Sequence, residues 1–578
     1  MTAQYVIIAG QPPADAETRM RRVPSLIHRH KGLAIWSDTT PISIGDRGWL
    51  LGHLFRRSRE STRIETLAES EVRIIEDSDG QHLIDAYWGG YVAVMRGVNG
   101  IVRVIRDPSG MMPCFFGRTD DAVIISDDAK SIVDFIMPAR PVDFGELARF
   151  IASPDWAGRE TCLAGVSEMI GGECLIWNHD RCDFQALWSP WKFAGRKNPH
   201  DDLGSELGEV LADTIGAWAE CFPKFVVGIS GGLDSSIVAT LSATGSTDPR
   251  YFTMVGADPD GDETRYAAIV TDSLGVPLNR FPYDAGVINV EEAPIRHQPR
   301  PSAAYFAQSI KAAHRALIAE ASTDALFVGN GGDGVFFSTR SASPLTDRCL
   351  AQGLGRGALE TLRDIAILTD ASWAEIVRQA IRRYRLRANA TQPKCDFTGL
   401  RREMIEAIGT PRPRHPWMIA AATAYPGKIA HVGNVMRAQK NISFYSHGDG
   451  PPQIAPLLSQ PVVELCLSIP TWRWVAAGHD RAVARQAVQH ILPKAIADRT
   501  SKGGPDGFMH ALSRRRGHEI REFLRNGVLV REGVIDPEFL DGPHEIGWRG
   551  KPAARRLLAF GVAESWTRYW LASADDRS

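Results

Sequence analysis

The sequence has no run of apolar residues that approaches the ~18 to 20 needed to span a bilayer. Its first residues, MTAQYVIIAGQPP, lack the basic segment and long apolar stretch of a secretion signal. The 66 basic and 68 acidic residues almost cancel, so no strong electrostatic field favours nucleic acid or an anionic membrane. We therefore expect a cytoplasmic protein that acts on a small molecule or a peptide, with neither nucleic acid nor membrane as a partner.

The eight cysteines stand singly, without a Cys-x-x-Cys pair. Their spacing therefore predicts neither a zinc site nor a disulfide framework. With 578 residues, of which 44% are hydrophobic, the chain is long enough for two or three domains that each bury a core.

The pattern of apolar runs changes near residue 200. Before it, short runs such as YVIIAG, GYVAVMRGV and AVIIS alternate with Gly, Asp, Asn and Pro turns, which predicts a β-rich domain at residues 1–195. After it, the amphipathic stretch ELGEVLADTIGAWAECF precedes alternating strand and helix signals, which predicts an α/β domain with a parallel sheet at residues 200–578. The strands expected there lie at 225–229, 251–256, 278–283 and 325–329.

One segment of the α/β part, FVVGISGGLDSSIVATL, predicts a strand, a glycine-rich turn and the start of a helix. This arrangement points backbone N–H groups and a helix N-terminus at a common point, where phosphate binds. The chain has no Gly-x4-Gly-Lys-Ser/Thr sequence, so the loop is not a Walker loop. An ordinary Gly-Ser turn is the alternative. The residues predicted to bind a nucleotide here are Ile229, Ser230, Gly231, Gly232, Leu233, Asp234, Ser235 and Ser236.

This loop resembles the pyrophosphate loop of N-type ATP pyrophosphatases, which cleave ATP between the α and β phosphates and leave AMP on the substrate. A second segment, GNGGDGVF at 329–336, resembles the Ser-Gly-x-Gly-x-Asp-Glu motif of asparagine synthetase relatives. Segments 261–267, 456–470 and 480–504 match further landmarks of that superfamily. The resemblance implies ATP and Mg²⁺ as cofactors, with Asp234 and Asp333 as metal ligands that also position the reacting phosphates. It also implies nucleotide contacts from Gly329, Asn330, Gly331 and Gly332.

The β-rich half resembles a class II glutamine amidotransferase domain in the segments GWLLGHLFRR, YWGGYVAVMRG and VRVIRDPSGMMPCFFGR. That domain needs a cysteine directly after the initiator Met as its nucleophile, and this chain has Thr2. The fold class implied is an α+β, degenerate amidotransferase domain of the Ntn-type β sandwich, followed by an α/β, HUP-like synthetase domain with a parallel sheet. We interpret the first domain as structural.

The departures from asparagine synthetases concern the amine. Asparagine synthetases carry Glu and β-lactam-forming relatives carry Tyr where this chain has Asn330, an amide that cannot accept a proton at neutral pH. Asn330 together with PLLSQ at 456–460 is similar to lasso-peptide cyclases, which join a peptide's N-terminal amine to an Asp or Glu side chain. That resemblance implies a precursor (core) peptide as substrate and a leader peptidase as partner.

Two alternatives remain open: an ammonia-dependent asparagine synthetase or other small-acid amide synthetase, and an inactive nucleotide-binding scaffold. For a cyclase, the resemblance implies that Lys502 stabilises the charge that develops when the amine attacks the adenylate, since relatives carry a lysine in this region. A surface lysine is the alternative for Lys502. His431, His447 and Asp449 are candidate proton acceptors or structural groups, and Glu263 and Asp262 are weaker site candidates.

Overall fold

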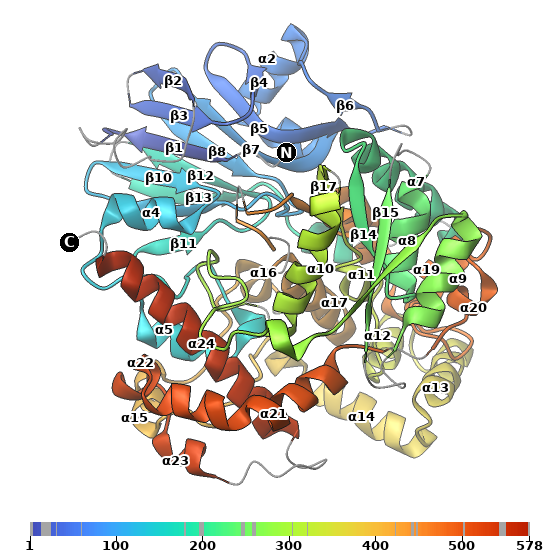
Figure 1. Ribbon diagram of the computed structural model, residues 1–578. Helices are drawn as coiled ribbons and strands as arrows, with labels where there is room; N and C mark the ends of the chain where they lie inside the picture. Colours follow the sequence, from blue (N-terminus) through green and yellow to red (C-terminus); the bar gives the residue numbers. More distant parts are fainter. Residues whose placement is uncertain are drawn as a thin grey trace.

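The computed structural model describes residues 4–12, 25–30, 32–58, 61–178, 181–195, 202–243, 249–256, 262–302, 304–320, 322–421, 424–440, 444–446, 449–500, 503–542 and 551–575. Antiparallel sheets form the N-terminal part, and a parallel sheet with many helices follows (Figure 1). The predicted change from β-rich to α/β chain is therefore confirmed. The boundaries 1–195 and 200–578 and the HUP-like detail stay predictions.

The N-terminal part contains two antiparallel sheets, with strand orders β11-β9-β10-β1-β3-β2 and β13-β12-β8-β7-β5-β4, and β6 pairs with β5. The strands are β1 Tyr5–Gly10, β2 Leu26–His30, β3 Leu33–Ser37, β4 Ile42–Ile44, β5 Gly48–Arg56, β6 Arg63–Ile64, β7 Tyr87–Arg96, β8 Val102–Arg106, β9 Phe115–Arg118, β10 Ala122–Ser126, β11 Val166–Glu168, β12 Glu173–Asn178 and β13 Arg181–Ala186. Short helices accompany them: α2 Glu69–Asp77, α3 Gln81–Ala86, α4 Ala129–Ile136, α5 Phe144–Ala152 and α6 Trp191–Ala194.

Alternation along β1 shows how these sheets are layered. Ile7 belongs to the apolar core between the two sheets, together with Val94 of β7. Its neighbour Ile8 points to the opposite face, where it shares a core with Leu147 of α5 and Leu557 near the C-terminus. Because successive side chains of a strand point to opposite faces, an apolar run buried on both sides indicates a strand covered twice.

The α/β part is built on a parallel sheet with the strand order β16-β15-β14-β17-β18. Its strands are β14 Phe225–Gly228, β15 Arg250–Val255, β16 Leu278–Pro282, β17 Ala325–Phe327 and β18 Gln453–Ile454. The four strands predicted from the sequence are confirmed. The fifth, β18, has only two residues and is too short to leave a periodic signal.

Helices cover both faces of this sheet. Those that pack around it are α7 Leu203–Cys221, α8 Leu233–Ser242, α9 Thr264–Leu274 and α10 Phe306–Glu320. Val227 shares a core with Ile237 of α8, whereas its neighbour Val226 packs with Leu317 of α10 on the other face. The predicted helix α7 begins at Leu203, three residues earlier than its apolar pattern, because the Asp202 side chain accepts a hydrogen bond from Ser205 N and caps it.

The remainder of the chain is helical. Its helices are α11 Gly332–Val335, α12 Ser343–Gln352, α13 Arg356–Thr369, α14 Trp373–Arg385, α15 Arg402–Ile408, α16 Pro416–Ile419, α17 Pro426–Gln439, α18 Gln460–Ser468, α19 Ala482–Val488, α20 Lys494–Ala497, α21 Asp506–Arg525, α22 Val528–Arg531, α23 Pro537–Asp541 and α24 Lys551–Asp575. Helix α24 packs along α21 and extends toward the N-terminal sheets (Figure 1). In the described part of the chain, no helix has the length and apolar character to cross a membrane.

Candidate active site

The order of the parallel strands places a crevice between β14 and β17. The chain runs outward from β14 through β15 to β16 and then returns to β17 on the other side of β14. In open α/β sheets, ligands bind outside the carboxyl ends of strands at such a reversal point. Residues 229–232 follow β14 and residues 328–331 follow β17, so both predicted nucleotide segments lie at this crevice.

Glycines allow these two segments to pack tightly against each other. A Cβ atom added to Gly332 would lie 2.3 Å from Asp234 Cγ, and one added to Gly329 would lie 2.7 Å from Ser235 N. Gly231 has a φ of +66°, a conformation that disfavours other residues, and its added Cβ would lie 2.3 Å from Tyr266 Cβ. The double glycines therefore shape the site through close backbone approach.

Hydrogen bonds inside the loop fix its conformation. The Ser230 and Ser235 hydroxyl oxygens are 3.2 Å apart, and Gly232 N donates to Ser230 Oγ at 3.3 Å. Ser236 Oγ instead donates to the Gly232 carbonyl at 2.8 Å and is buried in α8. Of the predicted binding residues, Gly231, Ser236 and Gly332 do not line the cavity, whereas the others do.

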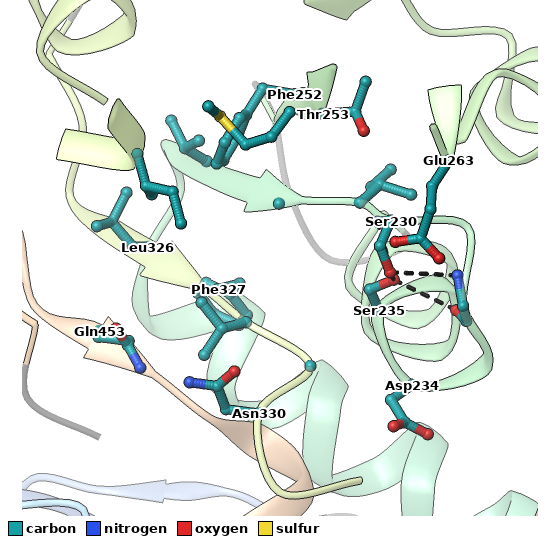
Figure 2. A pocket seen from close by; sticks show the side chains of 18 of the residues that line it. Ser230, Asp234, Ser235, Phe252, Thr253, Glu263, Leu326, Phe327, Asn330 and Gln453 are labelled. Carbon is teal, nitrogen blue, oxygen red and sulfur yellow. Dashed lines mark hydrogen bonds between the residues drawn. The ribbon is translucent and has the colours of Figure 1, made fainter. Parts of the chain in front are cut away.

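The loops border a cavity of about 430 Å³ with hydroxyl and carboxylate groups at one end, called the polar end, and mainly apolar side chains together with Asn330 and Gln453 at the other, called the apolar end (Figure 2). In Figure 2, the side chains of Ser230, Ser235 and Glu263 gather at one end of the pocket, and Phe252 and Leu326 lie toward the other. This volume and the mixed lining are typical of a site for a small organic ligand or cofactor. A nucleotide presents the matching chemistry, since its phosphates are charged and its base is flat and weakly polar.

The apolar end also contains His314 and Phe444, whose ring centroids are 5.7 Å apart. His314 Nδ1 lies 2.9 Å from the Tyr445 hydroxyl. Burial, with a smaller contribution from nearby Lys311, lowers the pKa of His314 to about 4, so its imidazole is neutral near pH 7. A neutral ring beside aromatic groups suits a base and adds no charge to this end.

Two carboxylates at the polar end share one cation. Arg481 Nη1 lies 3.2 Å from Asp234 Oδ1 and 2.9 Å from Asp333 Oδ1. The two aspartates predicted to hold magnesium are thus brought to the same place. Mg²⁺ is commonly bound through one or two carboxylates together with substrate phosphates, so this donor set fits the metal.

A second arginine ties three segments of the polar end together. Arg499 Nη2 donates to Glu263 Oε1 at 2.8 Å, and its Nη1 donates to the Ser230 carbonyl at 3.3 Å. Gly503 N also donates to Glu263 Oε1, at 3.0 Å. Glu263, which lines the cavity, therefore anchors both Arg499 and Gly503. Its neighbour Asp262 instead accepts from Thr264 N at the start of α9.

The remaining candidates from the sequence lie elsewhere or outside the described residues. His431 is fully buried, its Nε2 lies 2.7 Å from the Val335 carbonyl, and it does not line the cavity. Asp449 accepts a hydrogen bond from Ser446 and is likewise not part of the lining. Lys502, Thr2 and His447 lie outside the described residues, so their roles stay predictions.

A comparison with protein families supplies the class of chemistry. The sequence model of asparagine synthase matches residues 206–567, which is more than half of the chain. The chain belongs to the asparagine synthase family. Membership supports ATP-dependent amide bond formation, and the matched range includes both predicted nucleotide segments, Arg481 and Arg499.

Other comparisons are more distant. A search of curated proteins found no match. Among solved structures, the chain is similar to a glutamine phosphoribosylpyrophosphate amidotransferase from B. subtilis complexed with ADP and GMP. That likeness has 14% identity over 43% of this chain and 65% of that chain, just under two thirds, with a TM-score of 0.20. A structure of the allosteric regulatory enzyme of purine biosynthesis is similar at 11% identity over 50% of this chain and 76% of that chain, with a TM-score of 0.21.

Sequence reasoning about this asparagine synthase family member missed several residues of the cavity. Arg481 and Arg499 both line the cavity and lie within the segment 480–504. In that segment the resemblance assigned a role only to Lys502. Phe252 in β15 and His314 in α10 carry no local signal, because an aromatic residue in a strand or helix is usually part of the core. Phe444 lies outside any helix or strand and belongs to no motif. Their placement at the site depends on how distant segments pack.

Proposed function

We propose that this protein closes a macrolactam ring in a lasso-type peptide. The side-chain carboxylate of an Asp or Glu in the core peptide attacks the α phosphorus of ATP, which gives an acyl-adenylate and pyrophosphate. The peptide's own N-terminal amine then attacks the adenylate carbonyl, which forms the isopeptide bond and releases AMP. Membership of the asparagine synthase family supports the amide chemistry, and the composition of the cavity favours this source of the amine.

The observation that carries the proposal is that the carboxylates of the cavity are paired with arginines. Among the described lining residues, the carboxylates are Asp234, Glu263 and Asp333, and each contacts an arginine. Asn330 lines the cavity where asparagine synthetase relatives carry Glu. An α-amine has a pKa of roughly 7.7 to 8.0, so a useful fraction is neutral near pH 7 and needs no strong base. Ammonia, which is mostly ammonium at that pH, depends more on one.

In the proposed activation step, the residues of the polar end have different roles. Backbone N–H groups of the loop after β14 and the Ser230 hydroxyl, which lines the cavity, would hold the leaving pyrophosphate. Asp234 and Asp333 would hold Mg²⁺, which when bound neutralises phosphate charge. Arg499 fixes the Ser230 carbonyl and so keeps the loop in position. Lys502 would stabilise the charge that develops as the amine attacks.

The partners follow from the same chemistry. Ring closure requires a free N-terminal amine on the core peptide, so a leader peptidase must first cut the precursor. In this proposal the N-terminal sheets are a degenerate amidotransferase-like domain with a supporting role, because Thr2 stands in the position of the nucleophilic cysteine.

The test is to incubate the protein with MgATP, a matching leader peptidase and a precursor whose core begins with Gly and carries Asp or Glu about eight residues later. We expect a product lighter by one water, formed together with AMP and pyrophosphate. Release of ADP would contradict adenylation. Amidation of free aspartate by ammonia, with no change in the peptide, would instead identify an asparagine synthetase. Absence of pyrophosphate with every substrate would identify a scaffold.

A further inference from the structure

Arg481 enters the cavity from an unusual backbone position. It immediately precedes α19 and has a φ of +53°, the left-handed region that costs a non-glycine residue free energy. Its side chain is only 12% exposed. Strain of this kind persists where surrounding contacts hold it, and it is common at functional sites. The contacts of the guanidinium group show what holds it here.

Three carboxylates surround this guanidinium. Nη1 is shared between Asp234 and Asp333, and Nε lies 3.2 Å from Asp480 Oδ2. Asp480 is itself fixed, since it accepts a hydrogen bond from Ser338 Oγ at 2.8 Å. Burial alone would lower the pKa of Arg481, but these carboxylates outweigh it and raise the pKa. The side chain therefore remains a cation at every physiological pH.

Arg481 Nη1 lies between Asp234 and Asp333, in the space that a metal bound to both carboxylates would need. Mg²⁺ binds carboxylate oxygens at about 2.0–2.1 Å, so an ion on the facing oxygens would lie close to Nη1. Two cations that close repel each other, and the low exposure of the Arg481 and Asp234 side chains, 12% and 13%, limits screening by water. The metal and the present position of the Arg481 guanidinium are thus mutually exclusive at Asp234 and Asp333.

We propose that Arg481 is the internal counter-ion of the metal-binding aspartates, and that it makes metal binding depend on the nucleotide. Without nucleotide, Arg481 neutralises Asp234 and Asp333 and keeps divalent cations out. When MgATP enters, the polyphosphate offers the guanidinium a new anionic partner, to which its planar fork is well matched. Asp234 and Asp333 would then be available to the metal, while Asp480, whose Oδ2 lies 3.2 Å from Nε without a hydrogen bond, would remain an ionic partner of the guanidinium. This inference rests on the metal role of the two aspartates in the proposed function.

The physical consequence is a coupling between two ligands of one site. A free enzyme with two adjacent, unneutralised aspartates would bind metal whether or not ATP is present. With Arg481 in place, metal alone must displace a paired cation that gains no new partner, whereas polyphosphate supplies the displaced guanidinium with another anion. Couplings of this kind typically change affinity by about 5- to 150-fold.

The test measures Mn²⁺ binding to the full chain without peptide, by the electron paramagnetic resonance signal of the free ion. In the absence of nucleotide we expect Arg481→Gln to bind Mn²⁺ about tenfold or more tightly than wild type. Arg481→Lys, which keeps the charge, should remain close to wild type. With α,β-methylene-ATP present, the wild-type affinity should rise sharply and that of Arg481→Gln should rise much less.

Three further variants assign the effect to these groups. Arg481→Gln combined with Asp234→Asn should lose the gain in Mn²⁺ affinity. Arg250→Gln removes an arginine from the opposite end of β15, where it pairs with Glu320, and should behave as wild type. Arg481→Met provides a second uncharged side chain if the glutamine variant does not fold.

Unchanged Mn²⁺ affinity in both uncharged variants would overturn the inference, as would a gain that survives Asp234→Asn. Because no peptide is present, the result does not depend on the ring-closing reaction. Coupled binding without a macrolactam product would refute only the proposed substrate. A macrolactam product with uncoupled metal binding would refute only the role of Arg481.

Discussion

Glu168, at the end of β11, accepts a hydrogen bond from Arg300 at 2.6 Å and thereby joins the N-terminal sheets to the α/β part. Its other oxygen accepts from Arg106 of β8 at 3.2 Å. Arg300 also donates to the carbonyl of Glu160 at 2.7 Å. Both arginine side chains are at least nine-tenths buried, so Glu168 is the counter-charge that makes their burial tolerable.

We expect Glu168→Ala to destabilise the protein by about 3 kcal/mol, because it leaves two buried guanidinium groups without their shared carboxylate. Urea unfolding followed by tryptophan fluorescence measures this. Arg181→Ala is the matched control, since Arg181 pairs with Asp183 on the surface and such pairs contribute at most about 1 kcal/mol. Equal losses for the two variants would contradict the role given to Glu168.

The same carboxylate predicts an acid sensitivity. Burial raises the pKa of Glu168, but Arg300 and Arg106 outweigh it, so its pKa in the folded protein lies below the ordinary value. A group with a lowered folded pKa stabilises fully above its unfolded pKa of about 4.3, and this contribution is lost as pH falls through the folded pKa. Stability measured from pH 6 down to pH 3 should therefore fall less steeply in Glu168→Gln. An identical slope in wild type and Glu168→Gln would show that Glu168 is not a source of the acid sensitivity.

The close approach of the two nucleotide loops predicts a strong effect of one methyl group. In Gly332→Ala the new Cβ would overlap Asp234 Cγ, so the carboxylate must move. We expect ATP–pyrophosphate exchange to fall by about 10²-fold, the usual cost of a ~1 Å misplacement of a reacting group. Gly216→Ala is the control, because nothing lies within 4 Å of its added Cβ in α7. That change should leave exchange intact and stabilise by about 0.5–1 kcal/mol.

Two variants should affect activation and ring closure differently. Asp234→Ala removes a proposed metal ligand, and we expect it to abolish pyrophosphate release. Lys502→Ala should retain part of the exchange reaction and lose about 10²-fold in macrolactam formation, since its charge acts on the second step. Exchange with labelled pyrophosphate and mass spectrometry of the peptide measure the two steps. Equal losses at both steps in the two variants would refute this division.

The product of the reaction should depend on the amine supplied. With a core peptide whose N-terminus is acetylated, we expect AMP and pyrophosphate to appear without a ring, because the carboxylate can be activated but has no intramolecular nucleophile. Hydrolysis of the adenylate should make turnover slower than with the free amine. A ring formed from the acetylated peptide would show that another amine is used.

Local sequence was sufficient for the parts of this protein that depend on near neighbours. The strands β14, β15, β16 and β17 and the turn after β14 follow from apolar runs, glycine spacing and the helix start at Leu233, all within a few residues. These patterns also placed Asp234 and Asp333 just beyond β14 and β17, where the structure has them in the first turns of α8 and α11. The two-residue strand β18 left no such pattern and was missed.

The charge balance of the site was decided only by packing across the whole chain. Arg481 reaches Asp234 over 247 positions and Asp333 over 148, and Arg499 reaches Ser230 over 269. No local periodicity encodes such contacts, because they exist only after α19 and the segment beyond α20 have packed beside the parallel sheet. The shape of the glycine-rich loop is a property of a short stretch of backbone, whereas the cation that pairs with Asp234 and Asp333 comes from a distant helix terminus.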